Sequence, residues 1–150
     1  MTGFEVRRAA EEDLPVWASL RHQLWPHLSI EGHRAEILDA LAQPERLVGF
    51  LCLTATGNAI GLAEASVRSD YVNGCETSPV AFLEGIVVDP SARRQGVAAS
   101  LIAAVAEWAR NQGLSELASD AELQNTVSHA MHAALGFEET QRVVYFRKRL

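Results

Sequence analysis

The sequence is poor in cysteine, with only Cys52 and Cys75 among 150 residues. Two cysteines are too few for the disulfide framework of a small secreted domain, so we expect free thiols and a cytoplasmic location. Long apolar runs are also lacking, and no stretch approaches the roughly 20 residues that a membrane-spanning helix needs. The charged residues Glu5, Arg7 and Arg8 lie where a secretory signal would need an apolar segment, which argues against export.

Positive charge is scarce as well. The chain has 13 Lys and Arg against 19 Asp and Glu, which gives a formal net charge of −6. A nucleic-acid-binding domain is usually basic, so we expect no nucleic-acid partner, whereas a cationic substrate is compatible with this charge. Hydrophobic residues make up 48%, which is ordinary for a globular protein, and 150 residues predict a single domain spanning residues 1–150.

The two standard nucleotide-binding motifs are absent: there is no G-x-x-x-x-G-K-[ST], and no G-x-G-x-x-G follows a strand. The sequence has instead a predicted strand, loop and helix over residues 82–108. Phe82–Val88 is apolar and ends in β-branched residues, as in a buried strand, and Asp89-Pro90 ends it. A helix is predicted from near Gly96, because apolar residues then recur at helical spacing: Val97, Leu101, Ala104, Val105 and Trp108.

Arg93 and Arg94 lie just before this helix. A helix N-terminus already carries about half a positive charge, so two arginines there are unfavourable unless an anion binds. Gly96 and Ala98 would let the backbone approach such an anion, and the free N–H groups of the first turn point toward it. The loop therefore predicts a pyrophosphate site, and the alternative is an ordinary turn with solvated arginines.

The remaining pattern alternates short strands with helices. Gly85, in the middle of the central strand, indicates a β-bulge. The order predicts an α/β fold in which helices flank a single mixed β-sheet. We expect further strands over residues 4–8, 47–55, 59–67, 117–119 and 143–147, and further helices over residues 11–24, 31–42 and 125–135. The last helix is expected to turn these residues toward the core: Val127, Ala130, Met131 and Ala134.

Two motifs resemble a known enzyme family. The hexapeptide Arg93-Arg94-Gln95-Gly96-Val97-Ala98 resembles the R/Q-x-x-G-x-G/A acyl-CoA loop of the GCN5-related N-acetyltransferases. The last helix resembles the family pattern N-x-x-A-x-x-x-Y-x-x-x-G-F, with Ser128 for the alanine and His132 for the tyrosine. Within the family, several stretches look like the aminoglycoside 6′-N-acetyltransferases: residues 24–26, 70–75, 82–86, 136–140 and 147–149.

The resemblance implies a sheet with splayed central strands and acetyl-CoA as co-substrate. The backbone of Ile86, Val87 and Val88 would pair with the pantetheine arm, and Asn125 would bind further along the cofactor. The backbone of the loop and first helical turn would bind the pyrophosphate through Arg94, Gln95, Gly96, Val97, Ala98 and Ala99. Relatives of this type are dimers, so we expect a homodimer with the apolar run Val143–Phe146 at or near the interface.

The implied reaction is direct attack of an amine on a thioester, and the amine must first lose a proton. Glu84 is the candidate base, through a water, but it could instead hold the substrate by charge. A backbone N–H near Val87 would polarise the thioester carbonyl. His132 occupies the position of the acid that protonates the leaving thiolate, although the thiol of CoA already leaves well near neutral pH. Cys75 is expected to be a bystander.

The resemblance places an aminoglycoside pocket at Trp25, Tyr71, Glu84 and Asp120, because carboxylates and aromatic faces suit a polycationic sugar. Trp25 could instead be core, and Asp120 could instead cap the next helix. Gln141 stands where relatives are expected to carry an acid near the substrate.

A metal site is not expected, because His129 and His132 have no third ligand nearby in the sequence. Two other functions compete with aminoglycoside acetylation: acetylation of another small amine or a protein N-terminus, and a non-catalytic acyl-CoA-binding scaffold. The basic end Arg147-Lys148-Arg149 is expected to be solvated.

Overall fold

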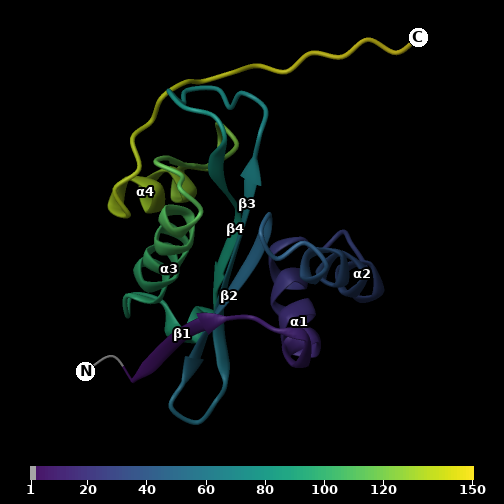
Figure 1. Ribbon diagram of the computed structural model, residues 1–150, viewed down its shortest axis with the longest axis vertical. Coiled ribbons are helices and arrows are strands. Elements are labelled where there is room, and N and C mark those ends of the chain that lie inside the picture. The colour runs from purple at the N-terminus through teal and green to yellow at the C-terminus, as the bar shows by residue number, and fades with distance from the viewer. Residues whose placement is uncertain (1–2) are drawn as a thin grey trace.

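The computed structural model describes residues 3–150 and shows a curled β-sheet covered on both faces by helices (Figure 1). The sheet order is β1-β2-β3-β4-β5, antiparallel throughout except for the parallel pair β4 and β5. The strands are β1 (Phe4–Arg8), β2 (Leu47–Thr54), β3 (Ala59–Arg68), β4 (Val80–Val88) and β5 (Leu117–Ala118). The helices are α1 (Leu14–Leu24), α2 (Ile30–Leu41), α3 (Val97–Asn111) and α4 (Thr126–Ala134), with short 3₁₀ turns at Glu11–Asp13 and Pro90–Ala92. The predicted α/β fold with one mixed sheet is thus confirmed.

Each face of the sheet has its own apolar core. On one face α3 packs its apolar stripe against β2, β3 and β4, and the buried residues of that helix are Val97, Leu101, Ile102, Val105, Trp108 and Ala109. On the other face, α1 and α2 cover the sheet. Trp17, Leu20 and Ile37 of these helices are buried together with Leu51 of β2 and Leu62 of β3. The helices form where the sequence shows helical spacing of apolar residues, because that spacing gives each helix one face to bury. None of the helices within residues 3–150 is long and apolar enough to cross a bilayer.

The predicted bulge lies in β4, opposite β3. Glu64 pairs with Gly85 and Ala65 pairs with Leu83, so Glu84 is the extra residue. A side chain at Gly85 would collide with α1 and the residue after it, because an added Cβ would lie 2.4 Å from Leu24 Cδ2 and 2.7 Å from Trp25 Cζ2. Glycine is therefore required at this position by close packing, and the register shift confirms the bulge that was expected from the sequence.

The sheet opens between its two parallel strands. β5 pairs with β4 only at Ala81 and Phe82, and β4 continues to Val88. Among residues 3–150 no strand pairs with this edge of β4 beyond Phe82. The backbone of residues 83–88 thus borders a gap in the sheet, and the predicted splay of the central strands is confirmed.

The C-terminal segment differs from the prediction. Residues 138–150 form no strand; they run away from the body as an extended arm (Figure 1, yellow). The expected strand over residues 143–147 is therefore wrong, and Tyr145 and Phe146 are 85% and 92% exposed. The run has the side chains of a strand, but a strand also needs a neighbour that offers unpaired backbone groups, and the described residues place none beside it.

The predicted inner face of α4 is also largely wrong. Val127 is 82% exposed, and Ala130 and Ala134 are exposed too, whereas Met131 is half-buried. The half-buried side of the helix carries Ser128, His129 and His132 instead. Apolar spacing alone misplaced this face, because small alanines carry little hydrophobic energy and polar contacts decide how the helix lies.

Candidate active site

A broad open hollow lies between α2, the end of β3, the loop after it, the gap beside β5, and the start of the C-terminal arm. All five residues expected to bind the acceptor line it: Trp25, Tyr71, Glu84, Asp120 and Gln141. His132 lines it as well. The predicted pyrophosphate loop lies outside this lining. The fold therefore brings together the acceptor residues and keeps the basic loop apart from them.

The loop before α3 has the backbone geometry of an anion site. Arg94 and Gly96 both adopt left-handed conformations, with φ of 64° and 83°, and successive N–H groups in such turns form a concave nest that binds anions. The first intrahelical bond is donated by Ser100 to Gly96 O at 3.0 Å, so the N–H groups of Val97, Ala98 and Ala99 remain free for a ligand. A Cβ added at Gly96 would meet no atom within 4 Å. These features fit the pyrophosphate of acetyl-CoA.

The edge of β4 combines two functions. The side chains of Ile86 and Val88 pack against the core under α3, and Val87 packs against the opposite core. Their main chain borders the gap described above. Core packing and cofactor pairing are therefore compatible, because they use different atoms.

Glu84 is held by two residues of β3 that sequence reasoning missed. Ser66 Oγ donates to Glu84 Oε2 at 2.5 Å, and Arg68 Nη2 lies 2.9 Å from Oε1. The Arg68 guanidinium also lies 3.5 Å above the Phe82 ring, which fixes it against the strand. In this arrangement Glu84 is an oriented carboxylate with Arg68 as its counter-ion, and its role as base or as substrate holder stays a prediction. The signal available in the sequence was weak: an alternating polar pattern at the end of β3.

His132 is held by contacts to both of its ring nitrogens. Its Nδ1 lies 2.7 Å from Ser128 O, a carbonyl that can only accept, so Nδ1 carries the proton. Its Nε2 lies 2.7 Å from Ser119 Oγ, within hydrogen-bond distance. The ring also packs edge-on to Phe137 at 5.0 Å between centroids. Ser119, which sequence reasoning missed, is thus the group through which His132 faces the gap beside β5.

Replacing His132 with alanine is expected to lower turnover by no more than about tenfold, because the CoA thiol leaves well without a strong acid. The main loss should appear in the KM for acetyl-CoA, since the Ser119–His132–Ser128 contacts position the start of α4. His129→Ala is the matched control, because His129 lies on the same helix and its side chain hydrogen-bonds to Glu122 O instead of Ser119. Steady-state kinetics measure both effects. A fall in kcat of several orders of magnitude in a folded variant would show that His132 acts as an essential acid.

The start of α4 is capped by Asn125. Its Oδ1 accepts from Ser128 N at 3.1 Å, so the alternative that Asp120 caps this helix is wrong. Asp120 is exposed, and its carboxylate makes no hydrogen bond or ion pair within residues 3–150. A carboxylate left free at the rim of the hollow is available to a cationic ligand. The cap uses the side-chain oxygen of Asn125.

The loop that carries Tyr71 is fastened at its far end. Glu116 accepts from the backbone N–H groups of Glu76 and Thr77 at 2.9 and 2.7 Å. The hydrogen bond from the Thr77 hydroxyl, together with these backbone bonds, lowers the pKa of Glu116. Tyr71 itself is 67% exposed over the hollow. Burial and the charge of Glu116 raise the pKa of the Cys75 thiol, so it stays protonated, in keeping with a bystander. Within residues 3–150 no group of His, Cys, Asp and Glu side chains is arranged to hold a metal ion.

The sheet opens beyond a bulge, and beside this opening a helix begins at a glycine-containing loop suited to an anion. Together these two features define an acyl-CoA-dependent transferase fold. The model of the Acetyltransferase (GNAT) family matches residues 9–137. This chain belongs to the GNAT acetyltransferase family.

The similarity to relatives extends over almost the whole chain. The aminoglycoside N(6′)-acetyltransferase type 1 of Serratia marcescens is 54% identical, over 93% of this chain and 94% of its own length. The enzyme of the same name from Salmonella enteritidis is 50% identical, over 97% and 99%. A solved structure of AAC(6′)-Iy with the bisubstrate analogue CoA-S-monomethyl-acetylneamine has a TM-score of 0.92 and 48% identity, over 98% of this chain and 99% of that one. AAC(6′)-Ih from Acinetobacter baumannii has a TM-score of 0.93 and 47% identity, over 99% of both chains.

Proposed function

We propose that this protein transfers the acetyl group of acetyl-CoA to the 6′-amino group of aminoglycosides by direct attack, and so confers resistance to these antibiotics. The observation that supports this most is the separation of charge in the site. The lining of the hollow carries more carboxylates than arginines, and the basic loop at the start of α3 lies apart from it. Such a division suits a polycationic acceptor and a pyrophosphate-bearing donor. The names and complexes of relatives about half identical in sequence point the same way.

Acetyl-CoA, when bound, supplies the acetyl group as a thioester. The backbone N–H groups of residues 96–99 would hold its pyrophosphate, and the free edge of Ile86–Val88 would pair with its pantetheine arm. Asp120 and the ion-paired Glu84 orient the ammonium groups of the acceptor toward the gap beside β5. The 6′-amine gives up a proton to water or to one of these carboxylates before its nitrogen bonds to the carbonyl carbon. As the C–S bond breaks, the attacking nitrogen would lose a second proton and the departing sulfur would gain one. The Ser119 and His132 side chains, 2.7 Å apart, are the candidates to move that proton.

A coupled thiol-release assay with matched aminoglycosides tests this function. A kanamycin- or tobramycin-type acceptor with a 6′-amine should release CoA thiol, and the analogue with a 6′-hydroxyl should not, because a hydroxyl is a much weaker nucleophile at neutral pH. Small amines and peptides with a free N-terminus serve as the competing acceptors. Equal turnover of the amine and hydroxyl analogues would contradict the regiochemistry, and turnover of peptides alone would favour the protein N-terminus as acceptor.

We further propose that residues 1–150 act as one acetyltransferase domain in the cytoplasm and that two copies form a homodimer. The C-terminal arm supports the dimer. Val144, Tyr145 and Phe146 are 73%, 85% and 92% exposed, which is costly for apolar side chains in water. Thr140, at the root of the arm, lies so near Gly74 that a Cβ added there would collide with its side chain.

Light scattering at micromolar concentration is expected to give twice the 16.4 kDa mass of the chain. Val144→Asp with Phe146→Asp should shift the mass to that of the monomer, because charges in a buried apolar contact are unfavourable. Arg149→Asp is the control: it adds negative charge to the same arm, outside the apolar run. A wild-type protein that scatters as a monomer would remove the dimer proposal.

A further inference from the structure

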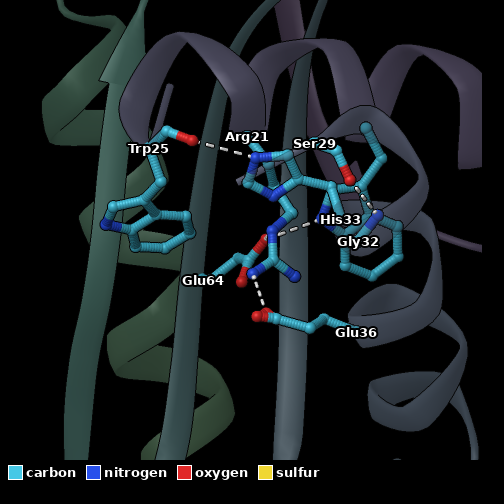
Figure 2. A network of polar contacts seen from close by, with 8 residues as sticks. Arg21, Trp25, Ser29, Gly32, His33, Glu36 and Glu64 are labelled. Atoms are coloured by element: carbon cyan, nitrogen blue, oxygen red, sulfur yellow. Dashed lines mark hydrogen bonds and ion pairs between the residues drawn. The ribbon is translucent and has the colours of Figure 1, made fainter. Parts of the chain in front are cut away.

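A carboxylate lies in the middle of β3, between the sheet and α1 (Figure 2). The side chain of this residue, Glu64, is only 14% exposed. Trp17 Nε1 donates to Glu64 Oε2 at 2.8 Å, and Arg21 Nε lies 3.5 Å from the same oxygen. Burial raises the pKa of Glu64, while Arg21 and Trp17 act in the opposite direction. The charged form of Glu64 thus depends on its two partners on α1.

Arg21 connects this carboxylate to the hollow. Its side chain is 9% exposed, and its Nη2 lies 3.2 Å from Oε2 of Glu36 on α2. Its guanidinium carbon lies 5.1 Å from the centre of the Trp25 ring, within the range of a cation–π contact. Glu64 and Glu36 therefore hold the guanidinium from two sides, with Trp25 along a third (Figure 2).

Trp25 itself follows the last turn of α1 and lines the hollow. Its carbonyl accepts from His33 Nε2 at 3.0 Å, and the fully buried His33 thereby anchors its backbone. An added Cβ at Gly85 would lie 2.7 Å from the indole, so the ring rests directly on β4 at the bulge. The orientation of the indole is thus set by His33, by Gly85 and by the Arg21 guanidinium.

The pair of Glu64 and Arg21 has little value for stability as such. Burying two charges costs about as much as their attraction returns, and replacing such a pair with apolar residues is often neutral or stabilising. A buried ion pair can instead hold the side chains around it in one conformation. Here the neighbour is the aromatic wall of the acceptor hollow.

We propose that Glu64 is a positioning residue for the acceptor: its charge holds the Arg21 guanidinium against Trp25 and so fixes the wall against which the aminoglycoside binds. This inference rests on the proposed function, because it takes the hollow as the aminoglycoside site. Arg21 itself lines the hollow, and without the charge of Glu64 its one remaining counter-ion among the described residues is the half-exposed Glu36. Its positive charge would then also repel a cationic acceptor.

Glu64→Gln tests the proposal. The amide keeps the volume and an oxygen for Trp17 Nε1 but removes the charge that holds Arg21. The KM for a 6′-amino aminoglycoside is expected to rise about tenfold, the effect of losing one charged contact. Both kcat and the KM for acetyl-CoA should stay within about twofold of wild type, because the loop at Gly96 is unaffected. Asp13→Asn is the matched control, since it breaks the Arg7–Asp13 pair at 2.8 Å outside the hollow and should leave the acceptor KM unchanged.

A double-mutant cycle with Trp25→Ala separates positioning from general loss of stability. If Glu64 acts through the indole, Glu64→Gln should add little to the acceptor KM once Trp25 is removed. The same cycle measured by urea unfolding reports the coupling between Glu64 and Trp25 without any turnover. A wild type that fails to acetylate aminoglycosides would therefore contradict the proposed function, while the coupling could still be measured.

An unchanged acceptor KM in folded Glu64→Gln, an equal rise for acetyl-CoA, or additive effects with Trp25→Ala would overturn the proposal. If Glu64→Gln does not fold, the half-exposed Glu36→Gln takes its place. That variant should raise the acceptor KM about two- to threefold, because it removes the weaker, more solvated side of the arginine contact. No rise in this variant would also overturn the proposal.

Discussion

Asp120→Asn is expected to raise the KM for an aminoglycoside about ten- to a hundredfold at low salt, from the 1.5–3 kcal/mol of a charged hydrogen bond. The reason is that Asp120 lines the hollow as an exposed carboxylate, free of any partner within residues 3–150, so its full charge is available to an ammonium group. The affinity for acetyl-CoA should scarcely change, because the anion loop lies apart from this rim. Initial-rate kinetics with each substrate varied in turn measure both quantities.

Salt and a distant carboxylate provide the controls for Asp120. Raising the ionic strength should reduce the difference between wild type and Asp120→Asn, since exposed charges are screened. Glu107→Gln removes the same charge from the exposed side of α3, outside the hollow, and should leave both KM values alone. If Asp120→Asn and Glu107→Gln behave alike, Asp120 does not contact the acceptor.

Gly96→Asp is expected to weaken the binding of acetyl-CoA by about ten- to a hundredfold or more, because it opposes a charged contact at the helix N-terminus. The new side chain would meet no protein atom, so it occupies the space that the pyrophosphate needs and adds a negative charge there. Gly113→Asp is the matched control: its φ of +79° and empty surroundings are nearly those of Gly96, with φ of +83°. Both variants carry the same backbone strain, and only one should lose cofactor affinity.

Calorimetry with acetyl-CoA and circular dichroism distinguish loss of binding from loss of fold. Both variants should lose a similar amount of stability, since aspartate at positive φ is strained but tolerated. A folded Gly96→Asp with the affinity of wild type would show that the loop before α3 does not bind the pyrophosphate.

The local features of this chain were predictable from the sequence. The hairpin of β2 and β3, the capped helix α2, the apolar stripe of α3 and the glycine loop before it all depend on residues close together in the chain. Gly85 indicated the bulge without any knowledge of β3, because a glycine inside an apolar strand often marks a bulge or a close approach of the backbone. The cluster of acceptor residues followed from the family resemblance and the order of the elements.

The contacts that orient the site were not predictable. Ser66 and Arg68 meet Glu84 across a bulged register, and that register depends on how both strands pack. Ser119 meets His132 from an element that pairs with its neighbour at only two positions. In the sequence, Glu64 is one charged residue in a strand of alternating polarity. Its burial under α1 can be recognised only once the helix is placed on the sheet.

The sequence by itself determined the secondary structure over most of the chain and the glycine loop before α3, because these depend on local periodicity and turn chemistry. Its short motifs gave the class of reaction through the family resemblance. Only the tertiary structure decided which side chains hold Glu84, which side chains contact His132, which face of α4 turns inward, and that Val143–Phe146 stays out of the sheet. These outcomes depend on partners far away in the chain. A strand needs a free edge and a charge needs a counter-ion at close range, and the sequence alone does not place either.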